Sequence, residues 1–209
     1  MKIAVVDYGS GNLRSAAKAF EHEAQGRAEI VVTSDADVVR KADRIVLPGQ
    51  GAFGDCAAGL RAVPGMVDAL NDAVVKRGAP FLGICVGMQL LAATGYEHGV
   101  HDGLGWLGGE VRRMEPKDSA LKLPQLGWNA LDFADHPLLK GWPKGAHVYF
   151  ANSYHFMPAD KANVIATAEY GGPIVAAVAK GNIAGTQFHP EKSQAIGLAL
   201  VSNFLEWRP

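Results

Sequence analysis

The stretch that decides the fold is Phe81-Leu82-Gly83-Ile84-Cys85-Val86-Gly87. Its first residues form a short apolar run, typical of a parallel strand that is covered on both faces. Glycines on either side of Cys85 allow a sharp turn in which a helix begins directly after the strand. Such a turn exposes its central residue at the carboxyl edge of the sheet, where the helix N-terminus favours a thiolate. The pattern predicts a nucleophile elbow at Cys85, and a buried cysteine between two packing glycines remains the alternative.

The residues before this elbow alternate between apolar strands and helices. We expect strands at residues 3–6, 29–33 and 44–47, the last stopped by Pro48-Gly49, and a fourth at 81–84. Helices are expected at 13–24, at a short segment ending near 41, at 63–77 and at 86–93. Alternation at this spacing indicates βαβ units, and therefore a doubly wound α/β fold with a parallel sheet.

The second half of the chain has a different pattern. Strands are expected at 111–114, 126–133, 147–150, 164–168, 174–179 and 183–188, with a terminal helix at 194–207. Glycine and proline separate these segments, which favours antiparallel or mixed pairs that extend the same sheet. No linker or repeat interrupts the chain, so we expect one domain over residues 1–209.

Composition excludes several classes of protein. Hydrophobic residues make up 48% of the 209 residues and charged residues 20%, which excludes a disordered or fibrous chain. A net charge of −1 provides no electrostatic footprint for nucleic acid or an anionic membrane. Two cysteines form no disulfide framework, and the apolar run at the N-terminus is too short for a signal peptide. No apolar run is long enough to span a bilayer, so we expect a cytoplasmic protein.

A thiol nucleophile needs a base and a group that orients the base. Of seven histidines, His189 has the best context, because it follows a predicted strand and lies two residues before Glu191. Pro190 fixes the backbone between them, so that Glu191 can accept from one ring nitrogen while the other faces the thiol. His147 and His155 are ambiguous, and four histidines lie in polar surroundings typical of the surface: His22, His98, His101 and His136. Cys56 has no elbow around it and is expected to be structural.

Together, the elbow and the motif Gln187-Phe188-His189-Pro190-Glu191 resemble the class I glutamine amidotransferases, as does a strand ending in Pro48-Gly49. The resemblance extends over nearly the whole chain. It implies an α/β, flavodoxin-like domain of the type 1 amidotransferase kind, with a mixed central sheet flanked by helices. It also implies a catalytic triad in which Cys85 is the nucleophile, His189 the base and acid, and Glu191 the orienting group.

Four stretches are similar, within that class, to the glutaminase subunits of imidazole glycerol phosphate synthases, which act in histidine biosynthesis. The stretches begin at Asp7 (DYGSGNL), Pro48 (PGQGAF), Leu126 (LGWN) and His189 (HPEKS). This similarity implies hydrolysis of L-glutamine to L-glutamate and ammonia. It also implies a heterodimer in which the ammonia passes through a channel to a cyclase subunit with a (β/α)₈ barrel.

The same resemblance implies roles for further residues. The backbone N–H of Val86 and the Gly49-Gln50 peptide match the oxyanion hole. Gly51, Gln89 and Glu97 match positions that bind the substrate glutamine. Asn12, Trp128 and Lys192 match positions that face the cyclase. Gln125 and Asn152 depart from the pattern, because histidine is common at both positions in relatives.

Rival interpretations remain open at the level of sequence. The same triad suits a glutaminase subunit for anthranilate, aminodeoxychorismate, guanylate or pyridoxal phosphate synthesis, against which the DYGSGN start and Lys192-Ser193 argue. A cysteine peptidase or a gamma-glutamyl hydrolase is a second rival. A flavodoxin-like binding module, holding phosphate at the Gly9-Ser10-Gly11 turn, is a third, and it leaves the triad residues unexplained. The resemblance implies no cofactor, and no residue cluster shows metal-ligand spacing.

Overall fold

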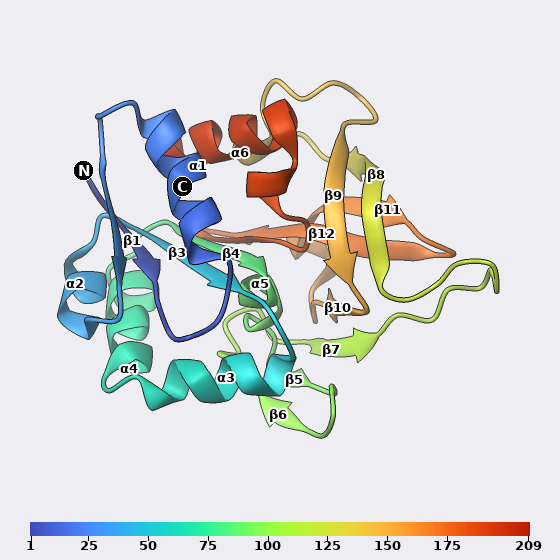
Figure 1. Cartoon of the computed structure of the whole chain (residues 1–209), viewed down its shortest axis with the longest axis horizontal. Helices are drawn as coiled ribbons and strands as arrows, with labels where there is room; N and C mark the ends of the chain where they lie inside the picture. The colour runs from blue at the N-terminus through green and yellow to red at the C-terminus, as the bar shows by residue number, and fades with distance from the viewer.

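A nine-stranded mixed sheet forms the centre of the protein, as a computed structural model of all 209 residues shows (Figure 1). The first five strands across the sheet are parallel and the remaining pairs are antiparallel. In spatial order the strands are β2 (Glu29–Thr33), β1 (Lys2–Val6), β3 (Arg44–Gly49), β4 (Phe81–Cys85), β13 (Ile183–Thr186), β12 (Pro173–Lys180), β11 (Val164–Glu169), β8 (Gln125–Phe133) and β9 (His147–Asn152). The predicted α/β class and the mixed extension of the sheet are therefore confirmed.

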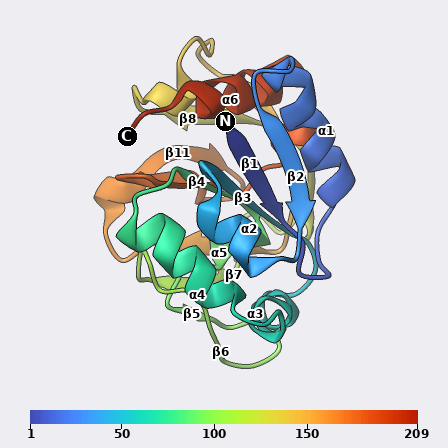
Figure 2. The same cartoon turned by 90° about the vertical axis from the view of Figure 1, so that its left-hand side faces the viewer.

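Helices cover both faces of the sheet, as the two perpendicular views show (Figures 1 and 2). One face carries α1 (Leu13–Ala24) and α6 (Gln194–Glu206). The opposite face carries α2 (Ala36–Lys41), α3 (Phe53–Ala62), α4 (Met66–Leu70) and α5 (Val86–Gln89). Short helical turns complete the chain: the π-helical η1 (Asn71–Lys76) and the 3₁₀ turns η2 (Pro137–Leu139), η3 (Lys161–Asn163) and η4 (Pro190–Lys192).

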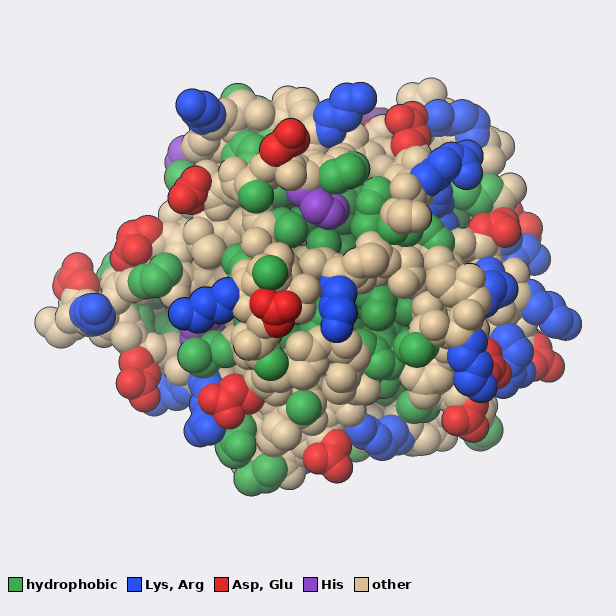
Figure 3. All heavy atoms as spheres, turned by 180° about the vertical axis from the view of Figure 1, so that it is seen from behind, with side chains coloured by type: hydrophobic (Ala, Val, Ile, Leu, Met, Phe, Trp, Pro, Cys, Tyr) green, Lys and Arg blue, Asp and Glu red, His purple; other side chains and the backbone are tan.

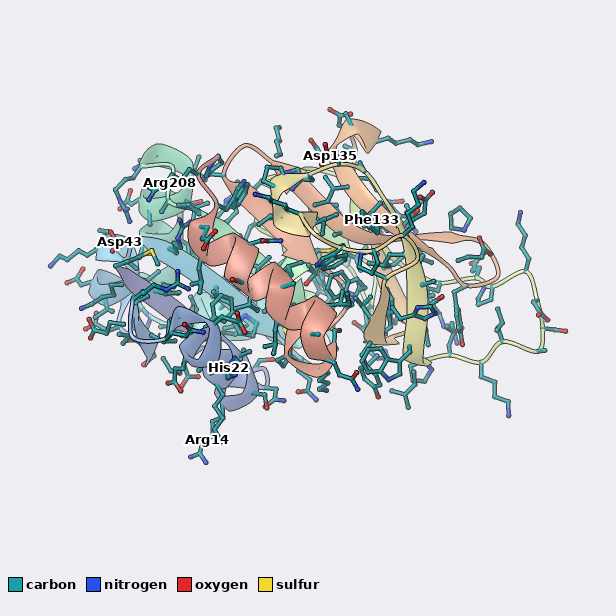
Figure 4. All side chains as sticks on the ribbon, turned by 90° about the horizontal axis from the view of Figure 1, so that it is seen from above. Arg14, His22, Asp43, Phe133, Asp135 and Arg208 are labelled. Carbon is teal, nitrogen blue, oxygen red and sulfur yellow. The ribbon has the colours of Figure 1, made fainter.

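The core forms where the apolar central strands meet these helices. β3 and β4 are buried along their whole length, because layers cover both of their faces. Phe20 of α1 packs edge-to-face against Phe204 of α6, with 6.0 Å between the ring centroids, and so joins the two helices on one face. Seen from above, α6 lies across the sheet, while Arg14 on α1 points away from it (Figure 4).

A second, four-stranded sheet lies beside the first. Its order is β10 (Tyr154–Met157), β7 (Glu110–Arg113), β5 (Thr94–Gly95) and β6 (His101–Asp102). The expected strand at 111–114 exists as β7, but the prediction that it extends the central sheet is wrong. Strands as short as β5 and β6 show no periodicity in the sequence, so only tertiary pairing defines them.

Three expected boundaries in the first half are also wrong. Pro48-Gly49 does not stop the third strand: both residues belong to β3 and pair with Ile84 and Cys85 of β4. The helix expected at 63–77 begins only at Met66, and α3 was not expected. The helix at 86–93 ends at Gln89, because the carbonyl groups of residues 90–93 accept backbone hydrogen bonds from the segment 103–107 instead.

The surface agrees with the small net charge. Acidic and basic side chains are interspersed on the face that Figure 3 shows, with apolar side chains between them. None of the helices combines the length and apolar character that crossing a membrane requires.

Candidate active site

Cys85 lies at the tip of a tight elbow between β4 and α5. Its backbone has φ 56° and ψ −114°, a strained conformation for a residue with a side chain. The flanking glycines are required, because a Cβ on Gly83 or Gly87 would overlap the backbone of Gly87 or Leu47 respectively. The elbow thus holds the thiol at the carboxyl edge of the sheet, as the sequence predicts.

His189 follows β13, the strand next to β4, which brings it to the same edge. Its Nδ1 donates to Glu191 Oε1 at 2.8 Å, and only 6% of the His189 side chain and 4% of the Glu191 side chain is exposed. The backbone around His189 is fixed, because its N–H donates to the carbonyl of Tyr149 at 3.0 Å and its carbonyl accepts from Ser193 Oγ at 2.6 Å. The two residues form a rigid pair.

The electrostatics of this pair favour a protonated imidazole. Burial lowers the pKa of His189, but hydrogen bonds to Cys85 and Glu191 and the charges of both groups raise it in net to about 9. At neutral pH the imidazole therefore holds a proton that it can donate. Glu191 Oε2 is buried and has no hydrogen-bond partner, so the bond to His189 is the one side-chain hydrogen bond that the carboxylate makes.

The predicted oxyanion groups differ in their present hydrogen bonds. Val86 is the first residue of α5, so its N–H has no acceptor within the helix. The N–H of Gln50 donates to Ser10 Oγ at 3.3 Å, and the Gln50 carbonyl accepts from the same hydroxyl at 2.5 Å. The Gln50 peptide is thus tied to Ser10, and its role as an oxyanion donor stays a prediction that requires the peptide to turn.

A cavity of about 220 Å³ contains the thiol and the imidazole. It also contains the three residues predicted to bind substrate, and Lys192 reaches its rim. Its lining is Gln50, Gly51, Cys85, Val86, Gln89, Glu97, Pro124, Ala151, Asn152, Ser153, Tyr154, His189 and Lys192. The structure thereby collects residues from distant parts of the chain around Cys85, in a space suited to a free amino acid.

Two of the residues predicted to bind substrate also make hydrogen bonds within the protein. Glu97 Oε2 accepts the N–H of Phe53 at 2.8 Å and caps the start of α3, 44 residues away in the sequence. Gln89 Nε2 donates to the carbonyl of Tyr154 at 3.1 Å and to Gln187 Oε1 at 3.0 Å. Because both hydrogens of that amide are used, only the Gln89 oxygen remains available to a ligand.

Two of the predicted partner residues, Trp128 and Lys192, lie around Tyr149 next to the cavity. Trp128 is 46% exposed on β8 and packs edge-to-face against Tyr149, with 6.0 Å between the ring centroids. Lys192 Nζ lies 5.8 Å from the centroid of the Tyr149 ring. Asn12 directly precedes α1 and makes no side-chain cap, and α1 packs on η4, which ends at Lys192. We call Trp128, Tyr149 and Lys192 the aromatic patch.

Of the remaining candidate residues, only Asn152 lines the cavity. Cys56 is fully buried in α3, where burial raises the pKa of its thiol. His147 is exposed on β9, and His155 on β10 lines a separate hollow of about 500 Å³, where burial lowers its pKa. Gln125 and Asn152, the two departures from the family pattern, are buried cross-strand neighbours. The sequence does not predict the contact of Ser10 with Gln50, because a serine in a turn does not reveal which distant residue its hydroxyl binds.

Comparison with known proteins agrees with this geometry. The sequence profile of the family "Glutamine amidotransferase class-I" matches residues 4–206. The "Imidazole glycerol phosphate synthase subunit HisH" of Rhodospirillum rubrum is 59% identical over 214 residues, covering 100% of each chain. The subunit of the same name from Caulobacter vibrioides is 57% identical over 211 residues, covering 99% of each chain.

A solved structure of a glutamine amidotransferase superposes with a TM-score of 0.70 over 97% of each chain. At 21% identity that likeness supports the fold alone. The full-length relatives favour the histidine-pathway interpretation over the other synthases, the peptidase and the binding module. The chain therefore belongs to the class I glutamine amidotransferase family, within the group of HisH subunits of imidazole glycerol phosphate synthase.

Proposed function

We propose that this chain hydrolyses L-glutamine through the triad Cys85, His189 and Glu191 and delivers the ammonia to a cyclase partner. The observation that carries the proposal is the strained elbow cysteine in one small cavity with a buried, protonated histidine–glutamate pair. No other part of the chain combines a nucleophile with an acid and its orienting group.

The first step forms a thioester. The Cys85 thiolate attacks the carboxamide carbon of glutamine, and negative charge develops on the carbonyl oxygen. The proton on His189 passes to the departing nitrogen, so that the C–N bond breaks and neutral ammonia leaves. Because the pKa of His189 is raised to about 9, the imidazole enters this step already protonated at neutral pH.

The second step hydrolyses the thioester. His189, now neutral, takes a proton from a water molecule, whose oxygen attacks the acyl carbon. The C–S bond breaks, the thiolate of Cys85 returns, and the new carboxylic acid loses the remaining water proton to solvent as glutamate leaves. Glu191 holds the imidazole in one orientation through both steps, because its hydrogen bond to Nδ1 directs Nε2 at the reacting atoms.

Backbone donors stabilise the charge on the oxygen. The N–H of Val86 acts at the start of α5, and the N–H of Gln50 becomes the second donor once it leaves Ser10. This N–H belongs to the Gly49–Gln50 peptide, and Gly49 carries no Cβ that would resist a turn of that peptide. Glu97 and the oxygen of Gln89 bind the amino-acid end of glutamine, where a carboxylate and a carbonyl suit an ammonium group.

The partner receives ammonia before water protonates it. The cyclase, a (β/α)₈ barrel by family resemblance, docks on the aromatic patch and on Asn12, forming a cytoplasmic heterodimer. Two large apolar side chains of β8 are exposed on this surface, Trp128 to 46% and Leu126 to 67%. The surface also adjoins the cavity, because Lys192 belongs to the aromatic patch and to the cavity lining. Exposed large apolar side chains on one face are typical of an interface.

The test is a pair of activities measured on the reconstituted complex. Cys85→Ala should abolish synthesis fed with glutamine, because no thioester can form, while synthesis fed with an ammonium salt should survive. Cys56→Ala is the matched control and should change either activity by no more than a few-fold. Loss of both activities in Cys85→Ala would show that the cysteine is structural. Failure of every cyclase subunit to bind the parent chain and stimulate it would reject the proposed partner.

A further inference from the structure

Gln187 is a buried amide next to the nucleophile that the mechanism above does not use. It directly follows β13, whose last residue, Thr186, lies beside Ile84 of β4, so Gln187 comes level with Cys85. The residue is 0% exposed, and its backbone N–H donates to the carbonyl of Ala176 at 2.8 Å. Its side-chain Nε2 lies 3.7 Å from Cys85 Sγ. A polar group this deeply buried needs specific partners.

The orientation of this amide follows from its hydrogen-bond chain. The carbonyl of Tyr154 can only accept, so the end of the Gln89 amide that faces it must be the NH₂ group, at 3.1 Å. That NH₂ group also faces the Gln187 amide at 3.0 Å, so the atom it meets there must be the oxygen. The other end of the Gln187 amide, which faces the sulfur, is therefore its NH₂ group.

An N–H aimed at sulfur discriminates between the two forms of the thiol. A neutral thiol is a weak acceptor, whereas a thiolate is a charged one, and hydrogen bonds to charged groups are roughly twice as strong as neutral ones. The surroundings are buried, so water competes little for the sulfur. His189 supplies the positive charge on one side, and Gln187 supplies a fixed dipole on another.

We propose that Gln187 is a catalytic residue whose amide N–H donates to the Cys85 sulfur, stabilises the thiolate and holds it in position for attack. This inference rests on the proposed role of Cys85 as the nucleophile. It also gives Gln89 a second task, because Gln89 fixes which end of the Gln187 amide meets the sulfur.

The test measures thiol reactivity on the isolated chain, without glutamine or partner. Gln187→Met keeps an unbranched side chain of similar length and removes the donor. We expect alkylation of Cys85 by iodoacetamide to slow about ten-fold at about pH 7, because a smaller share of the thiol is ionised. At about pH 10 the rates of parent and variant should converge, since alkaline solution favours thiolates with or without a hydrogen-bond donor. Mass spectrometry assigns the adduct to Cys85.

Gln125→Met is the matched control. It also replaces a buried glutamine, but the Gln125 side chain lies on a different strand and, unlike that of Gln187, makes no hydrogen bond. It should alkylate at the parent rate. Equal rates for Gln187→Met and the parent at about pH 7 would overturn the proposal. A slowing that is the same at both pH values would also overturn it, because that result reports access to the thiol rather than its ionisation. If the methionine variant does not fold, Gln187→Asn, which shortens the reach of the amide by one methylene, carries the same expectation.

Turnover of the reconstituted complex separates the two proposals. Gln187→Met should lower kcat about ten-fold and leave the KM for glutamine within about three-fold, because the donor acts on the nucleophile. A change confined to KM would mean that Gln187 only supports Gln89, and would reject the donor role. A parent complex that hydrolyses no glutamine would reject the proposed function, whereas the alkylation rates would still decide the hydrogen bond.

Discussion

Replacement of Glu191 by glutamine tests how far the site depends on one buried carboxylate. The hydrogen bond from His189 Nδ1 to Glu191 Oε1 is 2.8 Å long, and both side chains are almost fully buried. Glutamine preserves the length of the side chain and one oxygen acceptor but removes the charge. It also offers an NH₂ group, which competes with the oxygen for the position next to Nδ1.

The magnitude follows from the change of a charged acceptor to a neutral one. A hydrogen bond to a charged group contributes about 1.5–3 kcal/mol and a neutral one about 0.5–1.5 kcal/mol, so roughly 1–1.5 kcal/mol of imidazolium stabilisation is lost. That loss corresponds to about one pH unit. We expect the pKa of His189 to fall by that amount from about 9. Loss of the fixed ring orientation should lower turnover by about 10²-fold or more.

The assay is the pH dependence of glutamate release by the complex. The acid function of His189 needs its proton, so activity in the parent should be lost as the pH rises through about 9. In Glu191→Gln the same loss should begin about one pH unit lower, with the KM for glutamine within about three-fold of the parent value. Turnover within about three-fold of the parent, together with an unmoved alkaline limb, would refute the assigned role of Glu191.

Three further predictions concern the loop, the interface and the stability of the site. Gln50→Pro removes the second backbone donor and should lower turnover by about 10²–10³-fold with little change in glutamine binding; near-parent turnover would leave Val86 as the only backbone donor. Lys192→Ala should modestly weaken partner-stimulated glutaminase activity and leave the basal rate of the isolated chain nearly unchanged, and an equal drop in both would reject the interface role. The pKa of His189 is raised from 6.5 to about 9, so the contribution of this residue to stability is complete below pH 6.5 and is lost as the pH rises through about 9. Denaturant titrations at both ends of this pH range measure the loss as a fall in the free energy of unfolding. An equal fall in Glu191→Gln would contradict this role of the His189–Glu191 hydrogen bond.

Two helices, α3 and α5, differ from the sequence-based prediction, and in both cases the cause is a contact between distant residues. The helix α3 was not predicted, because Gly54 and Gly59 lower its intrinsic propensity. It forms against the body of the protein, and its first N–H is capped by Glu97 from 44 residues away. The early end of α5 has the same kind of cause, since a later segment takes the carbonyl groups that would have continued the helix.

The sequence by itself determined the α/β class, the elbow at Cys85 and the His189–Glu191 pair. Each of these depends on residues within a few positions of one another, where apolar runs, glycines and proline restrict the backbone directly. Only the tertiary structure decided that Ser10 binds the Gln50 peptide and that the Gln187 amide presents its NH₂ group to the sulfur. The direction of that amide depends on a chain of hydrogen bonds that starts at the carbonyl of Tyr154 and passes through Gln89. Residues so far apart in sequence constrain each other only after packing has buried them together, because exposed amides would be satisfied by water in any orientation.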